Sequence, residues 1–211
     1  MLEVMPVTLE GRSVRLEPLG EEHLPGLFES AQDDEIWAYL PVARPRSEAE
    51  FREWFETARQ AHLTGAQLPF AILDRERGVP IGSTRFMAVS RPDSSLEIGH
   101  TWLARQFWRT AANTESKYLL LRHAFDDLGC VRVWFKSDAR NVNSHRAIER
   151  LGAKREGVLR KHMRVKGGFH RDSAIFSIIR DEWPEVRARL EQRLGLTLAG
   201  PGPRTHNLAK M

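Results

Sequence analysis

The chain has 211 residues, of which 41% are hydrophobic and 28% are charged, and its formal net charge at pH 7 is +4. This length suits one domain, and charges spread along the whole chain exclude wholesale disorder. No stretch approaches the ~20 apolar residues of a membrane span and no apolar leader opens the chain, which predicts a cytoplasmic protein without a membrane partner. The small basic excess suits a polyanionic ligand, a nucleotide or RNA.

Four elements are expected in the first third of the chain. They are a strand at 13–19, a short helix at 21–31, an aromatic-rich loop at 34–41 and a longer helix opened by Ser47. Ser47 and Glu50 have the spacing of a capping box, and Gly65 is expected to end this helix. Three strands follow at 68–74, 79–89 and 94–103, and their short connections predict antiparallel neighbours.

The second half alternates helices and strands. The expected elements are helix 110–128, strand 131–137, helix 141–151 closed by Gly152, a hairpin of strands 154–164 and 169–180, and helix 181–194. This order predicts a mixed α+β fold with a mostly antiparallel sheet of six to seven strands and helices on both faces. The step from strand 94–103 to strand 131–137 requires a parallel crossover. Residues 1–199 are expected to form a single domain, followed by a loose tail at 200–211.

Two residue types argue against particular chemistries. The single cysteine, Cys130, excludes an internal disulfide, and its place at a helix–strand junction favours a buried thiol over a nucleophile. His123, His145 and His170 have no partners at metal-ligand spacing, so no metal is expected.

The segment from Trp102 to Glu115 leads from a strand through a short loop into a long helix. A helix N-terminus presents unpaired N–H groups and about half a positive charge, and small residues let a phosphate approach that backbone. Small, donor and basic side chains meet these needs here: Arg105, Arg109, Thr110, Ala111, Ala112, Asn113 and Thr114. The pattern indicates a pyrophosphate-binding turn, and the alternative is an ordinary capped helix after a surface loop.

A second strand leads into a helix at Asn141, with Ser144 on the same side of the helix start. Asn141 can bridge an amide group of a ligand, or it can simply cap the helix, with Ser144 as a surface residue. If strands 94–103 and 131–137 are parallel neighbours, both helix starts lie at the same end of the sheet. Ligands of open α/β sheets bind at that end.

With these segments, the chain resembles the GNAT superfamily of N-acetyltransferases, in particular the branch of the ribosomal-protein alanine N-acetyltransferases. The resemblance covers about residues 8–190 and rests on a combination of motifs. They are Leu96-Glu97-Ile98-Gly99-His100-Thr101-Trp102-Leu103, Thr114-Glu115-Ser116-Lys117, Ala124-Phe125, Asn141-x-x-Ser144, Ile148-Glu149-Arg150-Leu151-Gly152-Ala153, Glu156-Gly157-Val158-Leu159-Arg160, Arg171-Asp172 and Glu182-Trp183.

The resemblance implies a sheet splayed between its fourth and fifth strands, with acetyl-CoA as co-substrate in the gap and no metal. The backbone of Trp102, Leu103 and Ala104 would pair with the pantetheine amides. The turn from Trp108 to Thr114 would hold the pyrophosphate, and Asn141 would contact the pantetheine arm. Arg109 stands where the family has glycine, and it either blocks a positive φ or supplies a charge-assisted bond to phosphate.

The implied reaction is acyl transfer from a thioester to an amine, which needs a base, a donor to the carbonyl oxygen and a donor to the departing thiolate. Glu97 is the first candidate for the base and Asp172 the second. Glu97 could instead be an exposed acid on the strand, and Asp172 could be a structural carboxylate. A strand N–H near Leu103 would bind the carbonyl oxygen. Ser144 is the candidate donor to the thiolate, because Ile148 replaces the tyrosine of many family members.

Strand alternation predicts that His100 faces away from Glu97. Trp37, Tyr39 and Trp54 are expected to line the acceptor site or to belong to the core. The acceptor would be a protein N-terminus or a small amine, and the protein a monomer or homodimer that does not bind nucleic acid. Two other hypotheses are a non-catalytic acyl-CoA-binding module and an RNA-associated protein. The second lacks the interleaved aromatic and basic residues of RNA-binding modules.

Overall fold

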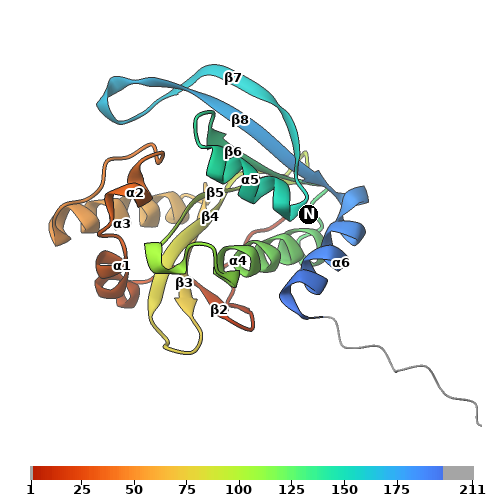
Figure 1. Cartoon of the computed structure of the whole chain (residues 1–211), viewed down its shortest axis with the longest axis horizontal. Coiled ribbons are helices and arrows are strands. Elements are labelled where there is room, and N and C mark those ends of the chain that lie inside the picture. The colour runs from red at the N-terminus through yellow and green to blue at the C-terminus, as the bar shows by residue number, and fades with distance from the viewer. Residues whose placement is uncertain (1, 197–211) are drawn as a thin grey trace, which may run out of the picture.

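The computed structural model describes residues 2–196 as a twisted sheet with helices packed on both of its faces (Figure 1). The tail predicted at residues 200–211 lies outside this part of the chain. None of the helices in residues 2–196 has both the length and the apolar character that crossing a bilayer requires.

Within the described residues the sheet has eight strands in the spatial order β1-β2-β3-β4-β5-β6-β8-β7. In chain order they are β1 (Leu9–Glu10), β2 (Val14–Pro18), β3 (Leu68–Asp74), β4 (Pro80–Ser90), β5 (Ser95–Leu103), β6 (Arg132–Asp138), β7 (Lys154–Arg164) and β8 (His170–Ile179). Every pair of neighbours is antiparallel except β5 and β6, which are parallel as predicted. The sequence missed only β1, because two residues are too few to show an alternating pattern.

The six α-helices of the described chain are α1 (Leu24–Ser30), α2 (Asp34–Trp37), α3 (Glu48–Leu63), α4 (Ala111–Arg122), α5 (Val142–Leu151) and α6 (Trp183–Leu194). Two regions differ from the expectation. The predicted loop at 34–41 contains the one-turn helix α2, which the Asp33 carboxylate caps by accepting a hydrogen bond from Glu35 N at 2.9 Å. The expected helix 110–128 becomes a π-helix at His123–Asp127, a change that apolar periodicity does not reveal.

Local signals set the ends of α3 and α5. Ser47 Oγ accepts a hydrogen bond from Glu50 N at 3.2 Å, whereas the Glu50 carboxylate bonds to Arg46 N, one residue before the position of a standard capping box. Gly65 and Gly152 follow the two helices with φ of 70° and 105°, the left-handed conformation that glycine adopts without steric cost.

The helices cover the two faces of the sheet in two groups. Along β3, Phe70 and Ile72 pack into the core beneath α4, α5 and α6, whereas Ala71 and Leu73 pack beneath α1, α2 and α3. Successive side chains of a strand point to opposite faces, so these four residues assign each helix group to its face. We call the side covered by α1 to α3 the acceptor face, because Trp37, Tyr39 and Trp54, which were expected near the acceptor site, belong to these helices or to the loop that follows α2.

The two parallel strands part after three paired positions. Ser95, Leu96 and Glu97 of β5 pair with Arg132, Val133 and Trp134 of β6. Beyond them β5 continues along β4 to Leu103, and β6 continues along β8 to Asp138. The predicted splay is therefore confirmed, and it begins directly after Glu97.

Candidate active site

The backbone of β5 borders the opening between the parted strands. Ala104 N–H donates to Ile81 O of β4 at 2.8 Å, so the N–H group of Ala104 points toward β4. Because successive N–H groups of an extended strand point to opposite edges, Leu103 N–H points toward the edge that β6 has left. The Leu103 carbonyl accepts a hydrogen bond from Trp108 Nε1 at 2.8 Å, which ties the following turn to the strand. Among Trp102, Leu103 and Ala104, whose backbone was predicted to bind pantetheine, Leu103 therefore has the N–H group that is best placed to bind it.

The turn before α4 exposes the start of that helix. Thr110 caps α4, since its Oγ1 accepts a hydrogen bond from Ala112 N at 3.2 Å and donates one to Phe107 O at 2.8 Å. The N–H groups of Thr110, Ala111 and Asn113 also precede the first bond within the helix and can bind an anion. Trp108, Arg109, Thr110 and Ala111 are exposed, so a ligand can reach this turn.

Arg109 has φ of +61°, the conformation that its β-carbon would block under the first of the two alternatives for this residue. That alternative is wrong, because the turn imposes the left-handed conformation on Arg109 even without glycine. A residue with a side chain adopts it at a cost of about 1–2 kcal/mol. The turn therefore has the backbone conformation that a glycine would allow, and Arg109 adds an exposed guanidinium to it.

The second helix start lies at the same end of the sheet as the first, because β5 and β6 are parallel and each leads into its helix (Figure 1). Asn141 Oδ1 accepts a hydrogen bond from Ser144 N at 3.0 Å, so Asn141 is an N-cap, as the structural interpretation predicted. This bond uses only the oxygen of the side-chain amide. The NH₂ group of Asn141 can still donate to a ligand, so capping and binding are compatible.

Glu97 occupies the last paired position before the strands part. Its side chain is buried, with 3% of the residue exposed, so the alternative of an exposed strand acid is wrong. Burial raises the pKa of the Glu97 carboxyl, and Lys136 Nζ, 3.2 Å from the carboxylate, opposes that rise. A carboxylate with a raised pKa is a better proton acceptor than an ordinary glutamate.

His100 lies on the same face of the sheet as Glu97, contrary to the expectation. Between the pairs Arg85–Gly99 and Ser83–Trp102, one residue of β4 stands against two residues of β5, His100 and Thr101, so β5 carries a bulge. His100 has φ of +50° at this bulge. The extra residue shifts the alternation by one position, which a count along the sequence could not show.

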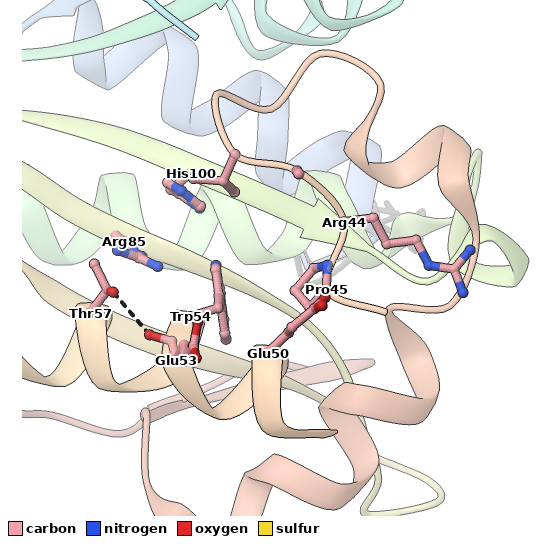
Figure 2. A pocket seen from close by; sticks show the side chains of 10 residues that line it. Arg44, Pro45, Glu50, Glu53, Trp54, Thr57, Arg85 and His100 are labelled. Atoms are coloured by element: carbon pink, nitrogen blue, oxygen red, sulfur yellow. Dashed lines mark hydrogen bonds between the residues drawn. The ribbon is translucent and has the colours of Figure 1, made fainter. Parts of the chain in front are cut away.

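A cavity of about 330 Å³ lies on the acceptor face between α3 and the bulged part of β5 (Figure 2). Trp54 of α3, Arg85 of β4 and His100 of β5 line its inner end. Trp54 therefore belongs both to the core and to the cavity wall. Trp37 is fully buried in the core, whereas Tyr39 is 42% exposed and lines a separate cavity of about 240 Å³ near Asp138.

Comparison with known proteins identifies this architecture. A family model described as an acetyltransferase (GNAT) domain matches residues 13–154. A GCN5-related N-acetyltransferase from Brucella melitensis is 32% identical, with a TM-score of 0.86 over 90% of this chain and 86% of that one. A protein from T. thermophilus that is assigned as an acetyltransferase is 43% identical over 91% of this chain and 99% of that one, with a TM-score of 0.77.

The chain belongs to the GNAT acetyltransferase family. Mycobacterium smegmatis RimJ, solved in complex with CoA-disulfide, has the same fold, with a TM-score of 0.77 at 21% identity over 90% of this chain and 95% of that one. The resemblance found in the motifs is thereby confirmed for the family and the fold, and this protein is an acetyltransferase.

The surroundings of three other residues of the acetyltransferase favour structural roles. The Glu115 carboxylate accepts hydrogen bonds from the backbone N–H groups of Arg12, Ser13 and Val14 at 2.6–3.1 Å, so it ties α4 to the start of β2. Asp172 is exposed and accepts a hydrogen bond from Lys161 N at 2.7 Å, which favours its structural interpretation. Burial raises the pKa of the Cys130 thiol to about 11, which argues against a nucleophile.

The buried charges that were not predicted include Arg85 and Lys117. Arg85 interrupts the apolar β4 run on the acceptor face, and a basic residue at a buried strand position was a signal that could have found it. Lys117 of α4 is buried and donates to the hydroxyls of Thr84 and Thr101. Burial lowers the pKa of Lys117 to about 7. No cluster of three or more His, Cys, Asp or Glu side chains suited to a metal occurs in residues 2–196.

Proposed function

We propose that this GNAT acetyltransferase transfers the acetyl group of acetyl-CoA to a primary amine by direct attack within a ternary complex. One observation carries the proposal: β5 and β6 part directly after a buried glutamate, and both lead to helix starts at the same end of the sheet. The opening gives a thioester access to the acceptor face, and the helix starts give its phosphates a place to bind.

The cofactor would lie along the free edge of β5. In this arrangement Leu103 N–H binds a pantetheine amide between Trp102 and Ala104, and the NH₂ group of Asn141 contacts the same arm from the side of α5. The pyrophosphate rests on the turn from Trp108 to Thr114. There the helix N-terminus and the Arg109 guanidinium supply complementary charge.

The position of Glu97 decides which way the acyl group points. Leu103 lies six positions after Glu97, which at ~3.3 Å per residue is roughly 20 Å along the strand. Glu97 can therefore act as the base only if the acetyl group lies near the parting point and the phosphates lie near α4. We accordingly assign the donor to the carbonyl oxygen to the backbone of the bulge at His100, which is closer to Glu97 than Leu103 is.

Each proton in the proposed step has a place to go. The acceptor arrives as an ammonium ion and transfers its proton to Glu97, directly or through water. The free amine then forms the new C–N bond as the C–S bond breaks, and its nitrogen gives up a second proton, which passes through the Ser144 hydroxyl to the departing thiolate so that CoA leaves as the thiol. The hydroxyl of Ser144 donates to the departing thiolate, a role that the buried Ile148 cannot fill.

Calorimetric titration with acetyl-CoA, followed by a thiol-release assay with a panel of amines, tests the proposal. We expect binding, and CoA release that depends on the amine. Ser144→Ala should lower kcat while leaving the Kd for acetyl-CoA unchanged. Tight binding without turnover on any amine, whether a small molecule or a peptide N-terminus, would instead make the protein an acyl-CoA-binding module.

A further inference from the structure

The cavity on the acceptor face collects buried polar atoms that have no partner. Six side-chain nitrogen atoms in the described residues are buried without a hydrogen bond. Four of the six belong to residues that line this one cavity, namely Arg44, Trp54, Arg85 and His100. A fifth, Trp102 Nε1, belongs to a ring whose centroid is 6.1 Å from that of Trp54. Buried polar groups are nearly always paired, so this concentration needs an explanation.

The unpaired atoms are mainly donors. Trp54 Nε1, Arg44 Nε and Arg85 Nε can only donate, and His100 Nδ1 donates when it carries the ring proton. Burial and the neighbouring Arg85 lower the pKa of His100 to about 3, so the ring is neutral and has one N–H at physiological pH. A complementary ligand must therefore offer oxygen atoms that accept hydrogen bonds.

Charge at the inner end of the cavity is also unbalanced. Arg85 is 4% exposed, and no described residue forms an ion pair with it; its one side-chain partner is the neutral Gln67, at 3.0 Å. Its guanidinium lies 5.4 Å from the centroid of the Trp54 ring (Figure 2). The second arginine, Arg44, is already paired with Asp34 at 3.1 Å. An anion inside the cavity would thus be bound mainly by Arg85.

The mouth of the cavity has the opposite charge. Glu50 and Glu53 line it from α3, and both are exposed (Figure 2). A polyanion would be repelled at the entrance, whereas a molecule with both an ammonium and a carboxylate group matches the mouth and the inner end.

We infer that this cavity binds a carboxylate group carried by the amine acceptor, with Arg85 as its cationic partner and Trp54 Nε1 and His100 as hydrogen-bond donors. The inference rests on the proposed function, since it names the acceptor class of the same site. His100 joins the cavity to the bulge of β5, so a carboxylate held there places an amine a few bonds away toward the parted strands. The carboxylate can be the α-carboxylate of a free amino acid or the side chain of an acidic N-terminal residue.

Matched acceptors test the inference and distinguish the two sources. We expect kcat/KM to be at least 10-fold higher for glutamate than for glutamate α-amide, or for a tetrapeptide that begins with Glu than for one that begins with Gln. A preference within the glutamate pair would identify the α-carboxylate of a free amino acid as the bound group. A preference within the peptide pair would identify the side chain of an acidic N-terminal residue. Arg85→Met should raise the KM of the preferred acceptor by roughly 10- to 100-fold, the effect of losing a charged hydrogen-bond partner. The KM of acetyl-CoA should not change.

Controls separate this effect from a folding defect. Arg52→Met removes an exposed arginine from α3, the helix that lines the cavity, where it pairs with Glu21, and should preserve the preference. Arg85→Lys keeps the charge and should retain part of the selectivity if Arg85→Met does not fold. Equal use of both members of each pair by the wild-type protein, or an unchanged preference in a folded Arg85→Met, would overturn the inference.

A second measurement does not depend on turnover. Titration of the protein with glutamate and with the Glu-initiated tetrapeptide should detect binding of one of them that Arg85→Met abolishes. If no amine is acetylated but this binding occurs, the proposed function fails and the carboxylate site stands. If amines are acetylated without preference for a carboxylate, the acetyltransferase proposal stands and this inference fails.

Discussion

The cofactor side and the acceptor side of the opening are built differently. The proposed cofactor groups come from two short segments, 102–114 and 141–144, and most of them are backbone N–H groups or helix caps. The acceptor side combines side chains from α3, β4 and β5, including the buried Arg85 and Glu97. A backbone N–H group remains when its side chain is replaced, whereas a buried charge is lost with its side chain. Substitutions on the acceptor side should therefore have larger effects than substitutions on the cofactor side.

Glu97→Gln should give the largest effect. If Glu97 is the base, kcat should fall by about 10²–10³-fold while the Kd for acetyl-CoA stays the same. The raised pKa of Glu97 also predicts that kcat/KM of the wild-type protein rises with pH through a range above that of an ordinary glutamate. Steady-state kinetics from pH 4 to 9 would measure both effects.

Asp172→Asn is the matched control for this prediction, since Asp172 is an exposed carboxylate on β8 that bonds to Lys161 N. It should leave kcat within about threefold of wild type, because general-base catalysis accounts for far larger factors. A greater loss in Asp172→Asn than in Glu97→Gln would reverse the assignment of the base.

Lys117 is an exception to the comparison, because it is a buried charge on α4, the helix of the cofactor side. Its folded-state pKa of about 7 lies below the ordinary lysine value, so the folded protein binds this proton less tightly than the unfolded chain does. Its cost to stability is greatest below pH 7 and disappears as the pH rises toward 10.5. Lys117→Met should raise the free energy of unfolding by about 1–3 kcal/mol at pH 6.

Urea denaturation at pH 6 and pH 9 would measure this difference, which should shrink at the higher pH. Lys154→Met is a suitable control, because Lys154 has a 75% exposed side chain that pairs with Glu182. A destabilised Lys117→Met at both pH values would show that the bonds to Thr84 and Thr101 outweigh the cost of burial.

Asn141 allows binding to be separated from capping. Asn141→Ala removes the cap and the NH₂ donor, so it should lower stability by about 1 kcal/mol and weaken acetyl-CoA binding by about 10-fold. Asn141→Asp keeps an oxygen that caps α5 but loses the donor, so it should weaken binding without lowering stability. Thermal unfolding and calorimetry would measure both, and unchanged affinity in both variants would assign Asn141 to capping alone.

Arg109→Gly should have the smallest effect, because the backbone of the turn already adopts the required conformation. Removing the strain should raise the free energy of unfolding by about 1 kcal/mol. Loss of the guanidinium should weaken acetyl-CoA binding by about three- to tenfold if it contacts the pyrophosphate, since exposed charge pairs contribute little. Tighter binding by the variant would mean that Arg109 obstructs the turn.

The sequence alone determined the elements and the family. Apolar periodicity and caps such as Ser47, Thr110 and Asn141 act over a few residues, so the strand and helix order and the parallel step from β5 to β6 could be predicted. Glu97 and the two helix starts followed from motifs that are also local.

Tertiary structure decided the face of His100, the φ of Arg109 and the surroundings of Arg85 and Lys117. A single extra residue in β5 reverses the side on which His100 lies, and nothing in local propensity indicates it. Burial and pairing depend on segments far apart in the chain, such as α3 against β4 and α4 against Thr84 and Thr101. These non-local contacts set the desolvation of each charge, which is why the sequence could name the charged residues but not their environment.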